Sequence, residues 1–159
     1  MVLSDCERDS LLELLTQNAA LNRARYRPRG ASVDVEPLDF AVSSHMDALV
    51  GTYGRFSLVL GSDITYAGLR FHFSSLATVI AGLLASDGVC LLAHEVRLAQ
   101  GRALAADGGD PALADLRECT DRVGLHWSIV YDDRPRDGFA RSGMRCIVKL
   151  AAASPPKRA

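Results

Sequence analysis

The sequence predicts an α/β protein with a three-layer sheet that is mostly parallel and ends in an antiparallel hairpin. Short apolar runs typical of strands alternate along the chain with longer segments that carry apolar residues at helical spacing. The continuous apolar run at residues 56–60 suits a strand buried on both faces of a parallel sheet. The last two strands are joined by a polar turn without a helix, which predicts the hairpin at one edge.

The first third of the chain is expected to begin with a strand and a helix. Residues 2–5 form a short strand that ends at Asp5, and Asp9 or Ser10 caps the helix that follows. That helix covers residues 11–22, because leucines recur along it at helical spacing and give it a broad apolar face.

A polar connection is expected next, at residues 23–31, where every second residue from 23 to 29 is an arginine. We expect this connection to be solvated; the alternative is a site for phosphate or an acidic partner. Residues 32–38 alternate between apolar and polar and predict a strand near a sheet edge, since Pro37 cannot donate to an interior ladder. A mobile stretch through residue 54 is expected after it.

The rest of the chain is expected to alternate helices and strands around the strand at residues 56–60. The predicted elements are a helix at 71–84 that stops at 86–88, a strand at 89–93, a frayed or flexible segment at 98–110, a helix at 111–123, strands at 127–131 and 144–150, and a polar turn at 132–143 between those strands. One domain over residues 1–150, followed by a disordered tail at 151–159, is the expected organisation.

Composition narrows the class of protein. The chain has 159 residues, of which 48% are hydrophobic and 23% charged, as in soluble globular domains. With a net charge of -1, the chain has no general electrostatic attraction to nucleic acid or to an anionic membrane. The four cysteines lie far apart without a C-x-x-C pair, so neither a metal site nor a disulfide framework is indicated. With no secretory signal and no apolar run of membrane-spanning length, a cytoplasmic protein is expected.

Three successive predicted strands end on an acid: Asp5, Asp39 and Asp63. In a parallel sheet these carboxylates lie along one edge, where they can accept hydrogen bonds from ribose hydroxyls, an adenine amino group or a cationic amine. Tyr66 stands three residues after Asp63, and an acid and a phenol together can orient an amine. The alternative is that Asp63 caps the next helix and Tyr66 packs beneath it.

These elements resemble the seven-stranded S-adenosylmethionine-dependent methyltransferases, and among them the methyltransferase-like family of protein lysine methyltransferases. The resemblance covers about residues 2–150. It is most specific at the Asp-x-x-Tyr element in its strand context and at the Ala-His-Glu-x-Arg end of the next strand. The matching pieces are Val2-Leu3-Ser4-Asp5, the helix with Asn18 and Asn22, Leu38-Asp39-Phe40, Leu60-Gly61-Ser62-Asp63-Ile64-Thr65-Tyr66 and Leu91-Leu92-Ala93-His94-Glu95-Val96-Arg97.

The resemblance implies a Rossmann-like fold and S-adenosylmethionine as the cofactor. Asp5 would bind the ribose hydroxyls of this cofactor, and Asp39 and Phe40 would border the adenine. The family usually has Trp where this chain has Phe40, which keeps an aromatic wall. Ser62 would also contact the cofactor.

For catalysis, the resemblance places Asp63 and Tyr66 beside the methionine end of the cofactor and the substrate amine. No metal is implied. His94, Glu95 and Arg97 are interpreted as structural residues at the end of the sheet. The implied partner is a protein that carries the methylated lysine; neither nucleic acid nor a membrane is expected, and the oligomeric state stays open.

The sequence departs from the family at its start. It begins at what would be the second strand of the family, and no G-x-G motif occurs in it, although the family carries an acidic, glycine-rich turn after its first strand. We therefore expect an N-terminally truncated sheet with unpaired strand edges. Three explanations of the missing first strand are open. The sequence is part of an active enzyme, or the protein is a non-catalytic pseudo-methyltransferase that acts as a protein-interaction module. In the third, the two strands beside the gap pair with each other or with a strand from another chain. An unrelated Rossmann-like nucleotide binder is disfavoured, because the glycine-rich loop is absent.

Overall fold

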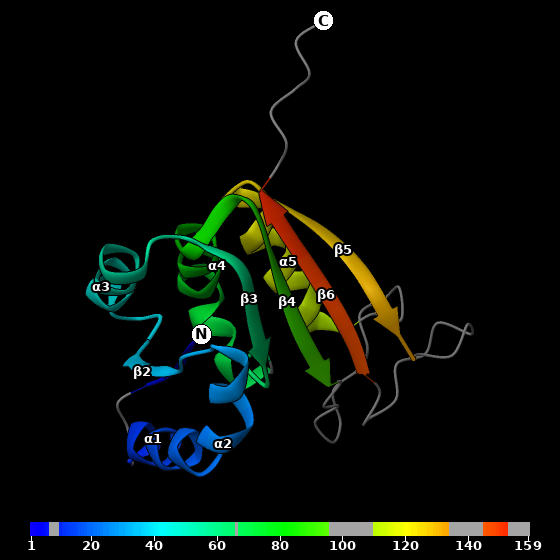
Figure 1. The fold of residues 1–159 in the computed structure, drawn as a ribbon. Helices are drawn as coiled ribbons and strands as arrows, with labels where there is room; N and C mark the ends of the chain where they lie inside the picture. The colour runs from blue at the N-terminus through cyan, green and yellow to red at the C-terminus, as the bar shows by residue number, and fades with distance from the viewer. Residues whose placement is uncertain (7–9, 66, 96–109, 134–144, 153–159) are drawn as a thin grey trace, which may run out of the picture. The chain divides into compact units, whose positions relative to one another are not determined.

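The computed structural model describes residues 1–6, 10–65, 67–95, 110–133 and 145–152. The chain divides into two compact units, Met1–Thr52 and Tyr53–Ala159. Figure 1 shows the elements of each unit, which are described separately here. Among the described residues no helix has the length and apolar character needed to cross a membrane.

The first unit combines a small parallel sheet with helices. The register runs from Val2 opposite Asp34 to Asp5 opposite Pro37, which confirms the strand ending at Asp5. The second strand was expected at residues 32–38 and is shorter, Asp34–Pro37, so Asp39 lies two residues beyond its end. The elements are β1 (Val2–Asp5), α1 (Leu11–Leu21), α2 (Arg23–Tyr26), the 3-10 helix η1 (Arg27–Arg29), β2 (Asp34–Pro37) and α3 (Ser43–Tyr53).

Two predictions for the first unit need correction. The arginine-rich connection is exposed apart from Tyr26, as expected of a solvated connection, but it is helical, since it forms α2 and η1. It ends at Gly30, whose φ of 70° is the left-handed conformation that glycine tolerates. Arginine is a good helix former, and a proline fits the first turn of η1. The stretch expected to be mobile forms α3, in which Leu49 is buried. Met46, Leu49, Val50 and Tyr53 recur at helical spacing and are less exposed than the residues between them, so the sequence does carry the signal for this helix.

The second unit is a mixed sheet with helices against it. The strand order is β3-β4-β6-β5; β3 and β4 are parallel, and β6 is antiparallel to both of its neighbours. This confirms the α/β class and the antiparallel hairpin at an edge. The elements are β3 (Phe56–Ser62), the 3-10 helix η2 (Ala67–His72), α4 (Phe73–Leu83), β4 (Leu84–Glu95), α5 (Pro111–Arg122), β5 (Leu125–Asp132) and β6 (Arg145–Ala152).

The core of this unit lies between α4, α5 and one face of the sheet, as Figure 1 shows. The register places Cys90 opposite Leu150, and Leu92 opposite Val148, and all four side chains are buried. Buried residues of the helices, among them Phe73, complete this core. Alternate residues of the same strands point to the opposite face of the sheet and are more exposed.

Two strand predictions in this unit need correction. β3 is an edge strand of its sheet, and Leu58 and Leu60 are 53% and 70% exposed, so it is not buried on both faces. A continuous apolar run fits an interior strand, but periodicity does not say where in the sheet that strand lies. β4 begins at Leu84, directly after α4, and the expected stop at residues 86–88 lies in an irregular part of the strand.

Some predictions fall mainly outside the described residues. The flexible segment at 98–110 is described only at Asp110, and the polar turn at 132–143 only at Asp132 and Asp133. β6 extends to Ala152, two residues beyond the expected end of the domain, and the remaining tail is not described.

Candidate active site

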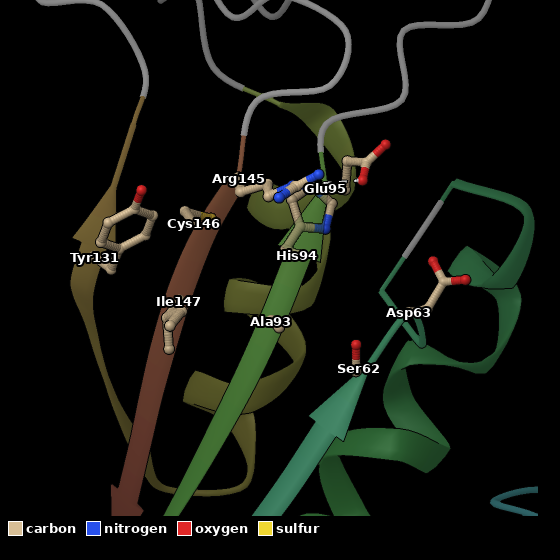
Figure 2. Close-up of a pocket in the computed structure, with 9 residues that line it drawn as sticks. All are labelled: Ser62, Asp63, Ala93, His94, Glu95, Tyr131, Arg145, Cys146 and Ile147. Carbon is tan, nitrogen blue, oxygen red and sulfur yellow. Dashed lines mark ion pairs between the residues drawn. The ribbon is translucent and has the colours of Figure 1, made fainter.

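The candidate site lies over the sheet face of the second unit that α4 and α5 do not cover. Ser62 pairs with Ala93, Ala93 with Ile147, and Ile147 with Tyr131, so these four residues form a row across all four strands. Paired residues point to the same face, and this row therefore makes a floor at the carboxyl ends of β3 and β4. Figure 2 shows Ser62 on one side of the pocket and Tyr131 on the other.

The pocket above this floor has a volume of about 390 Å³. Its charged side chains are Asp63, Glu95 and Arg145. Glu95 and Arg145 are register partners on β4 and β6, and their charged groups lie 3.8 Å apart. Arg145 is 73% exposed and Glu95 43%, so the pair is screened by water and stabilises the fold by at most about 1 kcal/mol.

Two predicted site residues, Ser62 and Asp63, line this pocket together. Asp63 follows β3 directly and has a φ of 60°, a left-handed conformation that costs a non-glycine residue about 1–2 kcal/mol. Such strain concentrates at functional sites, because the surrounding structure has to hold it. The N-cap of α4 is His72, so Asp63 does not cap that helix. Tyr66, the second predicted catalytic residue, lies outside the described residues.

The other three predicted site residues, Asp5, Asp39 and Phe40, belong to the first unit and are described apart from the pocket. Leu38 N donates to the carbonyl of Asp5 at 2.9 Å, so the ends of β1 and β2 bring Asp5 and Asp39 to the same edge. Asp5 is exposed, whereas Asp39 and Phe40 are half-buried.

The turn after β2 is held by its own hydrogen bonds. The Asp39 carboxylate accepts from Ala41 N at 2.8 Å, and Asp39 N donates to His45 Nδ1 at 3.2 Å. Carboxylates at the edge and an adjacent aromatic ring are the groups that recognise ribose hydroxyls and a purine. The residues present therefore fit the nucleoside part of a cofactor.

A buried polar network reaches the pocket at His94, which is one of the lining residues. Thr65 Oγ1 is 2.8 Å from His94 Nδ1, and His94 Nε2 is 2.9 Å from Asp110 Oδ2. Burial alone would raise the pKa of Asp110, but the hydrogen bonds from His94 and the backbone, together with the charge of His94, hold that pKa below its ordinary value. Asp110 Oδ1 also accepts from Ala112 N at 2.7 Å and so caps α5.

Sequence reasoning missed several of these residues. Tyr131 and Arg145 lie at the ends of the hairpin, and only the pairing register shows that they face the same pocket as Ser62. Asp110 directly before Pro111 is a local signal for a helix N-cap, but we assigned it to the end of a flexible segment. Of the described residues, none form a group of three or more side chains that could hold a metal ion.

Comparison with solved structures shows the class of fold. The chain is similar to the glycopeptide N-methyltransferase MtfA complexed with (S)-adenosyl-L-methionine, at 14% identity and a TM-score of 0.59, over 96% of this chain and 72% of that one. It is also similar to an S-adenosylmethionine-dependent methyltransferase from Clostridium acetobutylicum, at 10% identity and a TM-score of 0.57, over 96% of this chain and 75% of that one.

A third similar structure is the precorrin-6y C5,15-methyltransferase from Geobacter metallireducens, at 13% identity and a TM-score of 0.53. It is matched over 96% of this chain and 66% of its own length. At these identities the likeness establishes the fold alone, and that fold is the Rossmann-like methyltransferase fold.

The family follows from the sequence itself. Residues 1–104, more than half of the chain, match the model of a family described as lysine methyltransferase, and the chain belongs to that family. S-adenosylmethionine is the cofactor of this family. No curated protein matches the chain significantly. The resemblance and the cofactor class predicted from the sequence are confirmed.

Proposed function

We propose that this protein is an S-adenosylmethionine-dependent methyltransferase that methylates the ε-amine of a lysine in a protein substrate. The observation that carries the proposal is Asp63. Its backbone adopts the left-handed conformation directly after β3, and its side chain lines the pocket together with Ser62. A carboxylate at the carboxyl end of a parallel strand occupies the position where ligands bind in this class of sheet.

The cofactor half of the proposal rests on Asp5, Asp39, Phe40 and Ser62. The carboxylate of Asp5 at the end of β1 would accept hydrogen bonds from the ribose hydroxyls, and Asp39 and Phe40 would border the adenine. Ser62 lines the pocket and would contact the cofactor from the end of β3. When bound, S-adenosylmethionine supplies an electrophilic methyl group on a sulfonium.

The substrate half rests on the pocket. Asp63 places a carboxylate in the pocket, which favours the approach of a lysine ammonium, whereas the charge of Glu95 is paired with that of Arg145. Tyr131 gives an aromatic wall for the methylene stem. The amine attacks only after it has lost a proton, so orientation of the neutral amine is the main task. Asp63, with Tyr66 three residues later in the sequence, would accept the hydrogen bonds that orient the amine.

A methyl-transfer assay tests this proposal. The purified chain is incubated with radiolabelled S-adenosylmethionine and a cell extract, and labelled bands are examined by mass spectrometry for methylated lysine. Asp63→Asn removes the charge but keeps a residue that tolerates the left-handed conformation, so transfer should fall about 100-fold without loss of fold. Asp47→Asn, an exposed acid in α3, is the matched control. Unchanged transfer by Asp63→Asn removes Asp63 from the site.

A second candidate function is a non-catalytic pseudo-methyltransferase that acts as a protein-interaction module. Two observations favour it: β3 is an edge strand with exposed leucines, and the sequence has no glycine-rich G-x-G motif. An exposed edge strand can pair with an extended segment of a partner. Cofactor binding separates the two candidates, since the interaction module requires none.

We also propose that the protein works in the cytoplasm. All four cysteines, Cys6, Cys90, Cys119 and Cys146, are free thiols, which suits a reducing compartment. Burial raises the pKa of the Cys90 thiol to about 12, so that residue stays protonated and packs as a small apolar side chain.

A further inference from the structure

A chain of three buried polar side chains connects the pocket to α5. Thr65, His94 and Asp110 are 1%, 4% and 8% exposed and come from three different segments: the turn after β3, the end of β4 and the N-cap of α5. The distances of 2.8 Å and 2.9 Å between their polar atoms are those of good hydrogen bonds. A buried network of this kind is rigid when every member has a partner.

The positions of the protons in these two hydrogen bonds follow from the ionised state of Asp110. The low pKa of this carboxyl keeps it ionised, and an ionised carboxylate can only accept hydrogen bonds. His94 Nε2 therefore carries the proton that it donates to Asp110 Oδ2. When the ring carries no second proton, Nδ1 is an acceptor and the hydroxyl of Thr65 donates to it.

The network ends beside the strained turn of the pocket. Thr65 is two residues after Asp63, whose φ is 60°, and directly before Tyr66 in the sequence. A residue in this conformation persists only when its surroundings fix it. The hydrogen bond from Thr65 to His94 ties this turn to β4, and Asp110 ties His94 to the first turn of α5.

We propose that His94 is a positioning residue, which holds the turn containing Asp63 in its reactive orientation through Thr65. This inference rests on the proposed function, because it assigns Asp63 to the methyl-transfer site. His94 lines the pocket, but both of its ring nitrogens are occupied, one by Thr65 and the other by Asp110. Thr65 is 1% exposed, so both residues act through Asp63. Asp110 fixes the tautomer and orientation of the imidazole, as the outer partner of a histidine commonly does.

The test uses two substitutions that differ only in the hydroxyl group. Thr65→Val keeps the shape of the side chain and removes the donor to His94, whereas Thr65→Ser keeps the donor. A displaced catalytic group costs about 100-fold in rate. We therefore expect the kcat of Thr65→Val to fall about 100-fold with the KM for S-adenosylmethionine unchanged, and Thr65→Ser to restore transfer to within about threefold of the wild type. Equal kcat values for both variants and the wild type would overturn the proposal.

A second measurement does not depend on methyl transfer. Nuclear magnetic resonance of the full chain should show the Nε2–H tautomer of His94 in the wild type and in Thr65→Val. The amide signals of Asp63 and Ile64 should shift in Thr65→Val and return in Thr65→Ser. If these amides do not respond, the positioning role is wrong, even for an active enzyme. If they respond in a chain that transfers no methyl group, the proposed function fails while the link from His94 to the turn stands.

Discussion

Gly61 on β3 lies opposite Leu92 on β4, and the close packing between these strands leaves no room for a side chain at Gly61. A Cβ there would lie 2.6 Å from Leu92 Cδ2 and 2.8 Å from Ile64 Cδ1. Leu92 is 1% exposed and cannot move into solvent. The glycine between the apolar run and Asp63 therefore leaves the space that the side chains of Leu92 and Ile64 fill, just before the turn that carries the candidate catalytic acid.

Gly61→Ala should destabilise the protein by about 1–3 kcal/mol, the usual result of overpacking a core. Gly88→Ala should cost more, because its Cβ would lie 2.6 Å from the backbone carbonyl oxygen of Phe56, which cannot rotate away. Gly51→Ala is the control: nothing lies within 4 Å of its Cβ position, and alanine is the better helix former. Urea denaturation followed by circular dichroism measures all three. Equal stability of Gly61→Ala and the wild type would contradict the packing described here.

The backbone strain at Asp63 should be visible in the stabilities of a series of variants at this position. Asp63→Asn should leave the free energy of unfolding nearly unchanged, since asparagine also tolerates a φ of 60°, whereas Asp63→Ala should lose about 1 kcal/mol. Asp63→Gly should be more stable than Asp63→Ala, because glycine pays no steric penalty there. The midpoints of urea denaturation give this order. If alanine is tolerated as well as glycine, the turn is not strained.

Much of the fold could be predicted, because apolar periodicity reports directly on the helices that cover a core. The helices beginning at Leu11 and Pro111 end within one residue of their expected positions. The same spacing is present in α3, at Met46, Leu49, Val50 and Tyr53, but the glycines at 51 and 54 favour an irregular segment there. Periodicity places β3 wrongly, because sequence shows how apolar a strand is but not which strands lie beside it.

The site could be predicted only in part for the same reason. Ser62 and Asp63 follow a strand and are found by a local rule. The contacts of His94 with Thr65 and Asp110 join residues 29 and 16 positions apart, and they form only once β4 and α5 have packed together. The row from Ser62 to Tyr131 depends on three pairing registers, which no local pattern encodes.

The His94–Asp110 pair should make the protein sensitive to acid. The pKa of Asp110 in the folded protein lies below its ordinary value of 3.8. The stability that this carboxylate contributes is therefore fully present above pH 3.8 and is lost as the pH falls through the folded value. Asp110→Asn keeps the helix cap but removes the charge, so its Tm should lie below that of the wild type at pH 5, and the difference should shrink towards pH 2.

Asp110→Ala is the companion variant, because it removes the N-cap bond to Ala112 as well and should lose about 1 kcal/mol more than Asp110→Asn. Thermal melts followed by circular dichroism at several pH values measure both variants. A difference between Asp110→Asn and the wild type that stays constant down to pH 2 would show that the carboxylate contributes nothing through its charge.

Asp5 should matter for the cofactor and not for the fold. It is exposed, and its Oδ1 accepts a hydrogen bond only from the neighbouring Cys6 N among the bonds described. Losing hydrogen bonds from ribose hydroxyls to a carboxylate costs about 1.5–3 kcal/mol, so Asp5→Ala should raise the Kd for S-adenosylmethionine roughly 10- to 150-fold. Asp34→Ala, an exposed acid at the other end of the same sheet, is the matched control. An unaltered Kd would remove Asp5 from the cofactor site.

Titration calorimetry of S-adenosylmethionine into the 159-residue chain tests whether the protein binds the cofactor of its family. We expect one site with a micromolar Kd, which Asp5→Ala weakens. The Tm should rise when the cofactor is added, because a ligand that binds only the folded state stabilises it. A chain that melts cooperatively but shows neither heat of binding nor a shift in Tm would contradict the methyltransferase proposal and favour the protein-interaction module.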